Sequence, residues 1–235
     1  MPNHVMNHVT VYGDKEQIAS MLEAIKSDEF GLGSIDFNKI VPMPESLNME
    51  WGSATERGLK AYQDFVAVYT FDGANNGKDL LNIPEDKEKI FLDMRTDVSP
   101  EEWSLGRQAF RNTLQYGAAA WYDWCIENWG TKWNAYGLEE NGEQDLVDES
   151  PTVSFQTAWS APHPVLMRLA EMYPGVSFKH LWADENIGEN CGRSSYEEGE
   201  CTGVFSPMGK AAVQFANDVW DYDDIEESEA FIQSM

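Results

Sequence analysis

Two strand–helix–strand patterns, one near each end of the chain, constrain the fold more than any other feature of the sequence. In the first pattern, valines alternate with polar residues over residues 3–12, which is the period of a strand with one buried face. Residues 14–27 follow with apolar side chains at helical spacing. Ile35 and Phe37 then begin a predicted second short strand. These residues predict a strand, a helix and a strand in succession.

The second pattern lies in the last third of the chain. Apolar residues alternate over residues 153–159 and again over 176–182, and a helical pattern over 165–172 separates the two strands. A predicted hairpin over 191–201 and a predicted helix over 210–217 come next. Two such units predict an α+β fold with a ferredoxin-like split βαβ sheet, to which the hairpin and the helix are added.

The middle of the chain has helical rather than alternating patterns. Residues 55–71 and 85–94 have apolar side chains at helical spacing. A third helix is predicted to start at Ser99 and Pro100, because a serine cap and a proline in the first turn are typical helix starts. We expect Gly117 to bend this helix and Gly130 to end it.

These patterns together predict one domain over residues 1–235. Its sheet core is expected to comprise residues 1–47 and 150–205, with a large helical insertion at 48–137 and an acidic C-terminal segment at 218–235.

The chain is strongly acidic, with 41 Asp and Glu against 16 Lys and Arg and a formal net charge of −25. Hydrophobic residues make up 42% of it, which is too many for a disordered chain. The charge argues against direct binding to nucleic acid or to an anionic membrane surface. Because the sequence contains no long apolar run and its start does not resemble a signal peptide, a cytoplasmic location is expected.

The acids are concentrated in two segments that contain no base. The first segment comprises Glu139, Glu140, Glu143, Asp145, Asp148 and Glu149. The second comprises Asp218, Asp221, Asp223, Asp224, Glu226, Glu227 and Glu229. Such runs either solvate the protein or, when held on a folded scaffold, imitate the phosphate rows of DNA.

Four tryptophans lie close together in the sequence, at Trp121, Trp124, Trp129 and Trp133. Tryptophans in such a block can stack on bases or on a cofactor, but stacking platforms are normally flanked by several cations and only Lys132 is present here. The block is therefore interpreted as core packing.

Several segments of the chain resemble a known family. They are Met1–Val5, Phe37–Glu45, Trp121–Tyr136, Phe155–Pro162 and Trp182–Gly192. Together they look like the YubB-type ferredoxin-like family of bacterial plasmids and phages. The resemblance implies a ferredoxin-like fold and an origin on a mobile genetic element, and it assigns no catalytic residue.

The sequence shows little of the chemistry that enzymes use. His163 and His180 have no Ser or Cys partner that spacing identifies, and no set of residues has the spacing of a metal site, so no cofactor and no metal are predicted. An enzyme reading, a metal-dependent hydrolase, would use Asp123, Glu127 and Asp184.

We therefore hypothesise a non-catalytic accessory protein of a phage or plasmid. Its two acidic segments would bind the basic nucleic-acid-binding surface of a host protein or ribonucleoprotein in a defence complex, as an anti-restriction or anti-CRISPR DNA mimic. The alternatives are an accessory protein of another role, whose acids serve only solubility, and the metal-dependent hydrolase.

Overall fold

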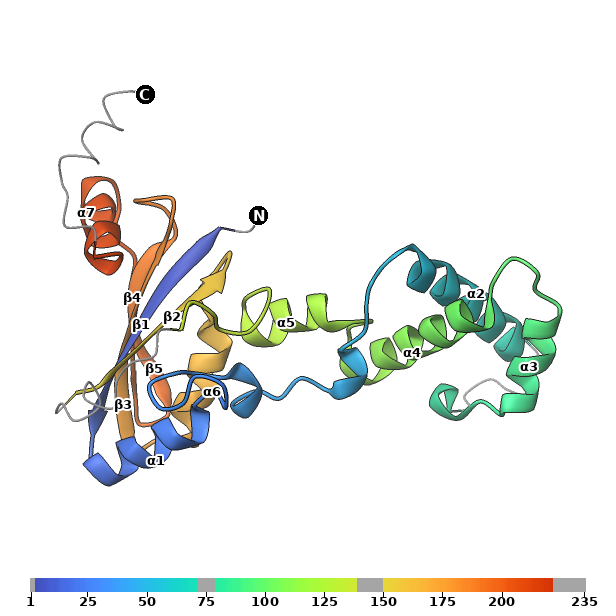
Figure 1. Cartoon of the computed structure of the whole chain (residues 1–235), viewed down its shortest axis with the longest axis horizontal. Helices are drawn as coiled ribbons and strands as arrows, with labels where there is room; N and C mark the ends of the chain where they lie inside the picture. The colour runs from blue at the N-terminus through green and yellow to red at the C-terminus, as the bar shows by residue number, and fades with distance from the viewer. Residues whose placement is uncertain (1–2, 72–78, 139–149, 222–235) are drawn as a thin grey trace. The chain divides into compact units, whose positions relative to one another are not determined.

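The computed structural model describes residues 3–71, 79–138 and 150–221, which form two compact units. The sheet unit comprises residues 1–42 and 125–235, and the helical unit comprises residues 43–124. Figure 1 shows the elements of both units. Each unit is described by itself.

The sheet unit is built on five antiparallel strands. These are β1 (His4–Gly13), β2 (Thr152–Ala158), β3 (Val176–Asp184), β4 (Cys191–Glu197) and β5 (Glu200–Phe205). The order across the sheet is β2-β1-β3-β4-β5, so that β1 is paired on both sides and β2 and β5 are the two edges. A turn at Glu198 and Gly199, both with positive φ, joins β4 to β5. The predicted strands over 3–12, 153–159 and 176–182 and the hairpin are confirmed.

Helices pack on both faces of this sheet (Figure 1). One face carries the valines of β1, and α1 (Lys15–Ile25) and α6 (His163–Met172) bury their apolar stripes against it. The other face is covered at one end by α7 (Lys210–Val219), whose Ala212 and Ala216 pack against Ala183 and Cys191. The rest of that second face has no helix over it among the described residues.

The strand predicted at Ile35 and Phe37 is wrong. This segment forms the 3-10 helix η1 (Phe37–Lys39) instead. The side chain of Asp36 accepts a hydrogen bond from the backbone of Asn38, and Asn134 Oδ1 accepts one from the backbone of Phe37 at 2.8 Å. Because side chains satisfy these backbone groups, the segment needs no neighbouring strand.

The helical unit contains the helices α2 (Ser53–Phe71), α3 (Glu85–Asp93) and α4 (Pro100–Tyr116), with the short 3-10 helices η2 (Glu45–Leu47) and η4 (Leu80–Asn82). Its core is aromatic: the rings of Phe65 and Trp103 both lie against that of Tyr62. The Tyr62 hydroxyl donates to the buried carboxylate of Glu88 at 2.9 Å, which also pairs with Arg107. A buried carboxylate is tolerated in such a core because it is paired in this way.

The expected start of α4 is confirmed in detail, because Ser99 and Glu102 form a reciprocal capping box and Pro100 lies in the first turn. The expected bend at Gly117 is wrong. Gly117 has a φ of 76° and ends α4, and a separate helix, α5 (Trp121–Trp129), follows. Gly130, with a φ of 75°, ends α5 as expected.

The α+β fold class is confirmed, with an antiparallel sheet, several helices and the added hairpin and C-terminal helix. No helix among the described residues is long and apolar enough to cross a bilayer.

Candidate functional site

Most of the predicted acidic surface lies outside the described residues. This applies to Glu139, Glu140, Glu143, Asp145, Asp148 and Glu149, and to Asp223, Asp224, Glu226, Glu227 and Glu229. Asp218 and Asp221 are described, and both side chains are exposed at the C-terminal end of α7. Asp218 accepts a hydrogen bond from Gln214 one helical turn earlier, at 2.8 Å.

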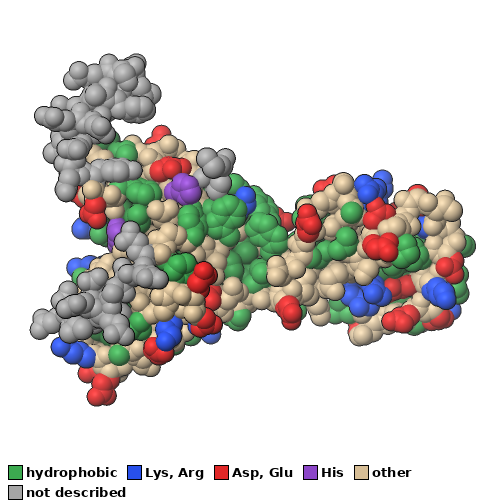
Figure 2. Space-filling view, in the orientation of Figure 1, with side chains coloured by type: hydrophobic (Ala, Val, Ile, Leu, Met, Phe, Trp, Pro, Cys, Tyr) green, Lys and Arg blue, Asp and Glu red, His purple; other side chains and the backbone are tan. Residues whose placement is uncertain are grey.

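Negative charge is distributed unequally between the two units. The sheet unit holds 27 of the Asp and Glu residues and eight of the Lys and Arg, whereas the helical unit holds 14 acids and eight bases. Figure 2 shows acidic and basic side chains interspersed over the visible face of the helical unit. Ion pairs there join Arg57 to Glu102 and Arg95 to Asp64 and Asp97. The helical unit therefore has a net charge of −6, and the larger part of the negative charge, −19, belongs to the sheet unit.

Asp218 and Asp221 line a hollow of about 430 Å³ between α7 and the sheet, together with His8, Leu181 and Arg193. The His8 imidazole is fixed there, because Nε2 donates to the carbonyl of Val219 at 2.8 Å. Its Nδ1 lies 2.7 Å from the hydroxyl oxygen of Ser154, a hydrogen-bond distance. The hollow combines two carboxylates with a guanidinium and an imidazole, which suits a polar partner group rather than an apolar ligand.

A groove of about 450 Å³ adjoins this hollow on the same sheet face and shares Leu181 and Arg193 with it. Lys179, Ser195 and Gly203 also line this groove. Sequence reasoning missed both cations, because single bases in alternating strands give no motif. Alternation along the strands is the signal that identifies them. Each cation is next to a buried residue of its strand, so its side chain lies on the opposite face of the sheet.

A buried polar chain lies on the helix-covered face of the sheet. His180 Nε2 donates to Asn7 Oδ1 at 3.0 Å, and Asn7 donates to Thr157 Oγ1 at 2.9 Å. The Ser194 hydroxyl is 3.4 Å from His180 Nδ1, so His180 has the serine partner that the sequence did not reveal. All four side chains are at most 1% exposed, so no substrate reaches them, and burial holds the pKa of His180 well below its usual range.

The tryptophan block divides into packed and partly exposed side chains. Trp124 and Trp129 are buried, and the Trp129 indole donates to the carbonyl of Val41 at 2.9 Å. Lys132 Nζ lies 4.5 Å from the ring centre of Trp133 and 5.0 Å from that of Trp159. Packing therefore accounts for two of the four predicted tryptophans, and a cation–aromatic contact engages Trp133.

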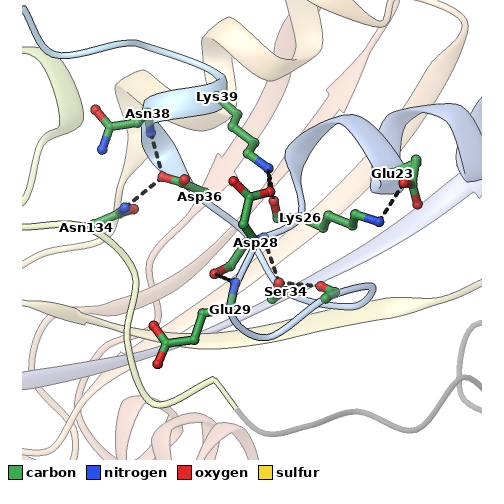
Figure 3. A network of polar contacts seen from close by, with 11 residues as sticks. Glu23, Lys26, Asp28, Glu29, Ser34, Asp36, Asn38, Lys39 and Asn134 are labelled. Carbon is green, nitrogen blue, oxygen red and sulfur yellow. Dashed lines mark hydrogen bonds and ion pairs between the residues drawn. The ribbon is translucent and has the colours of Figure 1, made fainter.

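Asn134, which follows this block, fixes the segment around Asp36 (Figure 3). Asn134 Nδ2 donates to Asp36 at 2.7 Å, while its Oδ1 accepts from the backbone of Phe37. Lys39 Nζ binds the carbonyl of Lys26 and the carboxylate of Asp28, and this contact lowers the pKa of Asp28. This polar network fixes the conformation of the loop.

The three carboxylates proposed for a metal-dependent hydrolase differ in burial and in hydrogen-bond partners. Asp184 is buried and accepts hydrogen bonds from Asn3, from the backbone of Asn186 and from Asn190. Asp123 and Glu127 are exposed on α5. Within the described ranges, no three His, Cys, Asp or Glu side chains are grouped as a metal site would need.

The cysteines of the predicted hairpin do not approach each other. Cys191 starts β4, whereas Cys201 pairs with Tyr196 near the turn, five residues further along that strand. Five residues of strand span about 16 Å, so the two thiols are too far apart to form a disulfide. Cys191 is buried and Cys201 is exposed.

Residues 129–229 match the model of a family described as the ferredoxin-like domain in Api92-like protein. This match agrees with the ferredoxin-like fold that the sheet patterns predicted. Among solved structures, the chain is similar to a crystal structure of the protein api92 from Yersinia pseudotuberculosis, with 8% identity and a TM-score of 0.44. That alignment covers 89% of this chain and 99% of the other. No curated protein matches the chain.

Proposed function

We propose that this protein is a non-catalytic binding protein whose acidic sheet unit occupies the basic, nucleic-acid-binding surface of a host defence complex. The observation that carries the proposal is the unequal distribution of charge, because the sheet unit accounts for 19 of the 25 excess negative charges. The resemblance to a plasmid and phage family supports a target in host defence.

The physical basis is electrostatic complementarity. Duplex DNA carries about one negative charge per 1.7 Å of its axis, and proteins that bind it present matching rows of Lys and Arg. A rigid scaffold that displays carboxylates competes for the same rows and is drawn to them by long-range attraction. Because mobile salt screens such attraction over about 10 Å at moderate ionic strength, the complex is expected to weaken as salt rises.

The proposal is tested by capture from a nuclease-treated bacterial lysate on the immobilised protein, followed by elution with duplex DNA. Two variants with the same change in charge are compared with the unmodified protein. In the first, Asp and Glu become Asn and Gln at Glu139, Glu140, Glu143, Asp145, Asp148 and Glu149. In the second, the same exchange is made in the helical unit at Glu45, Glu50, Glu56, Glu85, Asp93 and Glu101.

We expect the unmodified chain and the second variant to capture a basic nucleic-acid-binding protein that duplex DNA then releases. The first variant should capture little of it. Equal loss of capture in both variants would indicate a general charge effect and contradict the proposal. Capture that is unaffected by DNA and by high salt would indicate an accessory protein whose acids only solvate it.

A further inference from the structure

The two edges of the sheet differ in how their backbone groups are satisfied. At the β2 edge, Tyr136 and Gln156 exchange two backbone hydrogen bonds of 3.0 and 2.7 Å. Thr131 Oγ1 bonds both the amide and the carbonyl of Ala158. At the β5 edge, all six residues of the strand are exposed, and within the described ranges none of their backbone groups bonds a partner outside the sheet. An open edge of this kind is a template for another strand.

The groove that Lys179, Arg193 and Gly203 line lies on the same face of the sheet as α7, and it opens onto the β5 edge. Lys179 is paired with Ser195, and Ser195 is paired with Gly203, so the three lie in one row across β3, β4 and β5. Ser195 is small, and a Cβ added to Gly203 would have no atom within 4 Å. This row is therefore the floor of the groove, which runs from the open edge to Lys179 of β3.

The neighbouring row forms one wall of the groove and consists of Leu181, Arg193 and Phe205. The Arg193 guanidinium lies 4.9 Å from the ring centre of Phe205, and Lys179 Nζ lies 5.6 Å from that of Tyr12. Neither cation has a carboxylate within 4.0 Å among the residues that the structure describes. Asp218 and Asp221 line the adjoining hollow with Arg193, but neither forms an ion pair with it, so both cations can pair with an incoming anion.

We propose that the β5 edge binds an extended, acidic segment of a partner protein by strand addition, with one carboxylate side chain entering the groove over Gly203. The added strand would lie two strand spacings, about 9.6 Å, from β4. A glutamate from that strand and Arg193 from β4 together bridge this span. The planar guanidinium offers paired donors to the carboxylate, and Lys179 adds a second positive charge to the lining of the groove.

The side chains of the added strand would alternate between the two faces of the sheet. Acidic side chains would face the groove. Apolar side chains would lie beside Val204, which is 66% exposed on the face of the sheet that α1 and α6 cover. An alternating acidic and apolar sequence is therefore the chemistry that this edge recognises. The groove adjoins the hollow that Asp218 and Asp221 of the acidic surface line, and it takes a partner segment of opposite charge to the target of the proposed function.

The probe is a capped octapeptide that alternates valine and glutamate, titrated into the full chain and measured by calorimetry and by NMR of backbone amides. We expect binding that perturbs and protects the amides of residues 201–205. Arg193→Gln is expected to weaken it by about tenfold or more, the loss of one charge-assisted pair. Gly203→Val fills the groove and is expected to abolish binding, whereas Lys15→Gln on α1 is the matched control and should change nothing.

A second peptide, with glutamine in place of glutamate, separates charge from edge pairing and should bind about tenfold more weakly. The proposal is overturned if the glutamate peptide fails to bind at about 1 mM, the weak end of peptide recognition. It is equally overturned if both peptides bind alike, or if Arg193→Gln and Gly203→Val bind as well as the unmodified chain. Binding of oligothymidylate in the same groove with greater affinity, or self-association through residues 201–205, would assign the edge to another occupant.

Discussion

Gly58 of α2 and Gly106 of α4 meet at the crossing of these two helices, with no space for a side chain on either. A Cβ built on Gly58 would lie 1.8 Å from the carbonyl oxygen of Glu102, and one built on Gly106 would lie 1.9 Å from the carbonyl carbon of Gly58. Both distances are far inside van der Waals contact. The aromatic core of the helical unit depends on this close approach.

Gly106→Ala is therefore expected to destabilise the helical unit by about 3 kcal/mol or more, at or above the upper end of ordinary overpacking, because backbone cannot move aside as a side chain does. Denaturant titration checks this. Gly52→Ala is the control, because a Cβ at Gly52 has no atom within 4 Å. Equal stability of the two variants would show that the helices do not cross this closely.

His180 predicts a loss of stability in mild acid. Because burial lowers the pKa of His180 in the folded protein, the unfolded chain takes up a proton near pH 6.5 that the folded chain does not. The free energy of unfolding should therefore fall by up to about 1.4 kcal/mol per pH unit as pH drops from 6.5 towards 5. In His180→Gln this dependence should be about one proton smaller, as measured by urea titration at several pH values. An unchanged slope would contradict the buried, neutral imidazole.

Asn134→Ala should destabilise the sheet unit by about 1–3 kcal/mol, because it leaves the backbone amide of Phe37 without its acceptor and removes a donor from Asp36. Thermal unfolding measures the effect. Ser20→Ala, at an exposed position on α1, serves as the control and should differ little from the unmodified protein. If Asn134→Ala were as stable as the unmodified protein, the segment around Asp36 would be held by other contacts.

The three cysteines should differ sharply in reactivity. Burial raises the pKa of Cys125 to about 11 and also raises that of Cys191, so both are thiols at neutral pH and are shielded from reagent. Cys201 is exposed on β5. A thiol reagent added to the native protein should label Cys201 alone, which mass spectrometry of the peptides will show. Rapid labelling of Cys191 would contradict the packing of α7 against the sheet.

The predictable part of the fold is the part that periodicity fixes. The alternation of apolar and polar residues predicts the strands, because one face of each strand is buried. The start of α4 at Ser99 and Pro100 is predictable because helix capping depends on neighbouring residues. The segment at Ile35 and Phe37 was misread because its structure depends on Asn134, nearly a hundred residues away. Gly117 was misread because a glycine in a helical pattern fits both a bend and an end.

The candidate site was less predictable, for a related reason. Acid runs are visible in a sequence, yet only Asp218 and Asp221 of the predicted surface lie in the described part of the chain. The cations of the groove were invisible, because the row of Lys179, Ser195 and Gly203 exists only once the register of three strands is set. The register in which strands pair is a tertiary property that single residues do not predict.

The central claim is that carboxylates of the sheet unit contact a basic surface of a partner, and zero-length carbodiimide cross-linking of the captured complex tests it most directly. This reagent joins a carboxylate to a lysine amine only where the two groups touch. We predict cross-links from Asp and Glu of residues 1–42 and 125–235 to lysines of the partner's nucleic-acid-binding surface, and we predict that duplex DNA prevents them. Cross-links that arise from the helical unit, or that persist in the presence of DNA, would contradict the account.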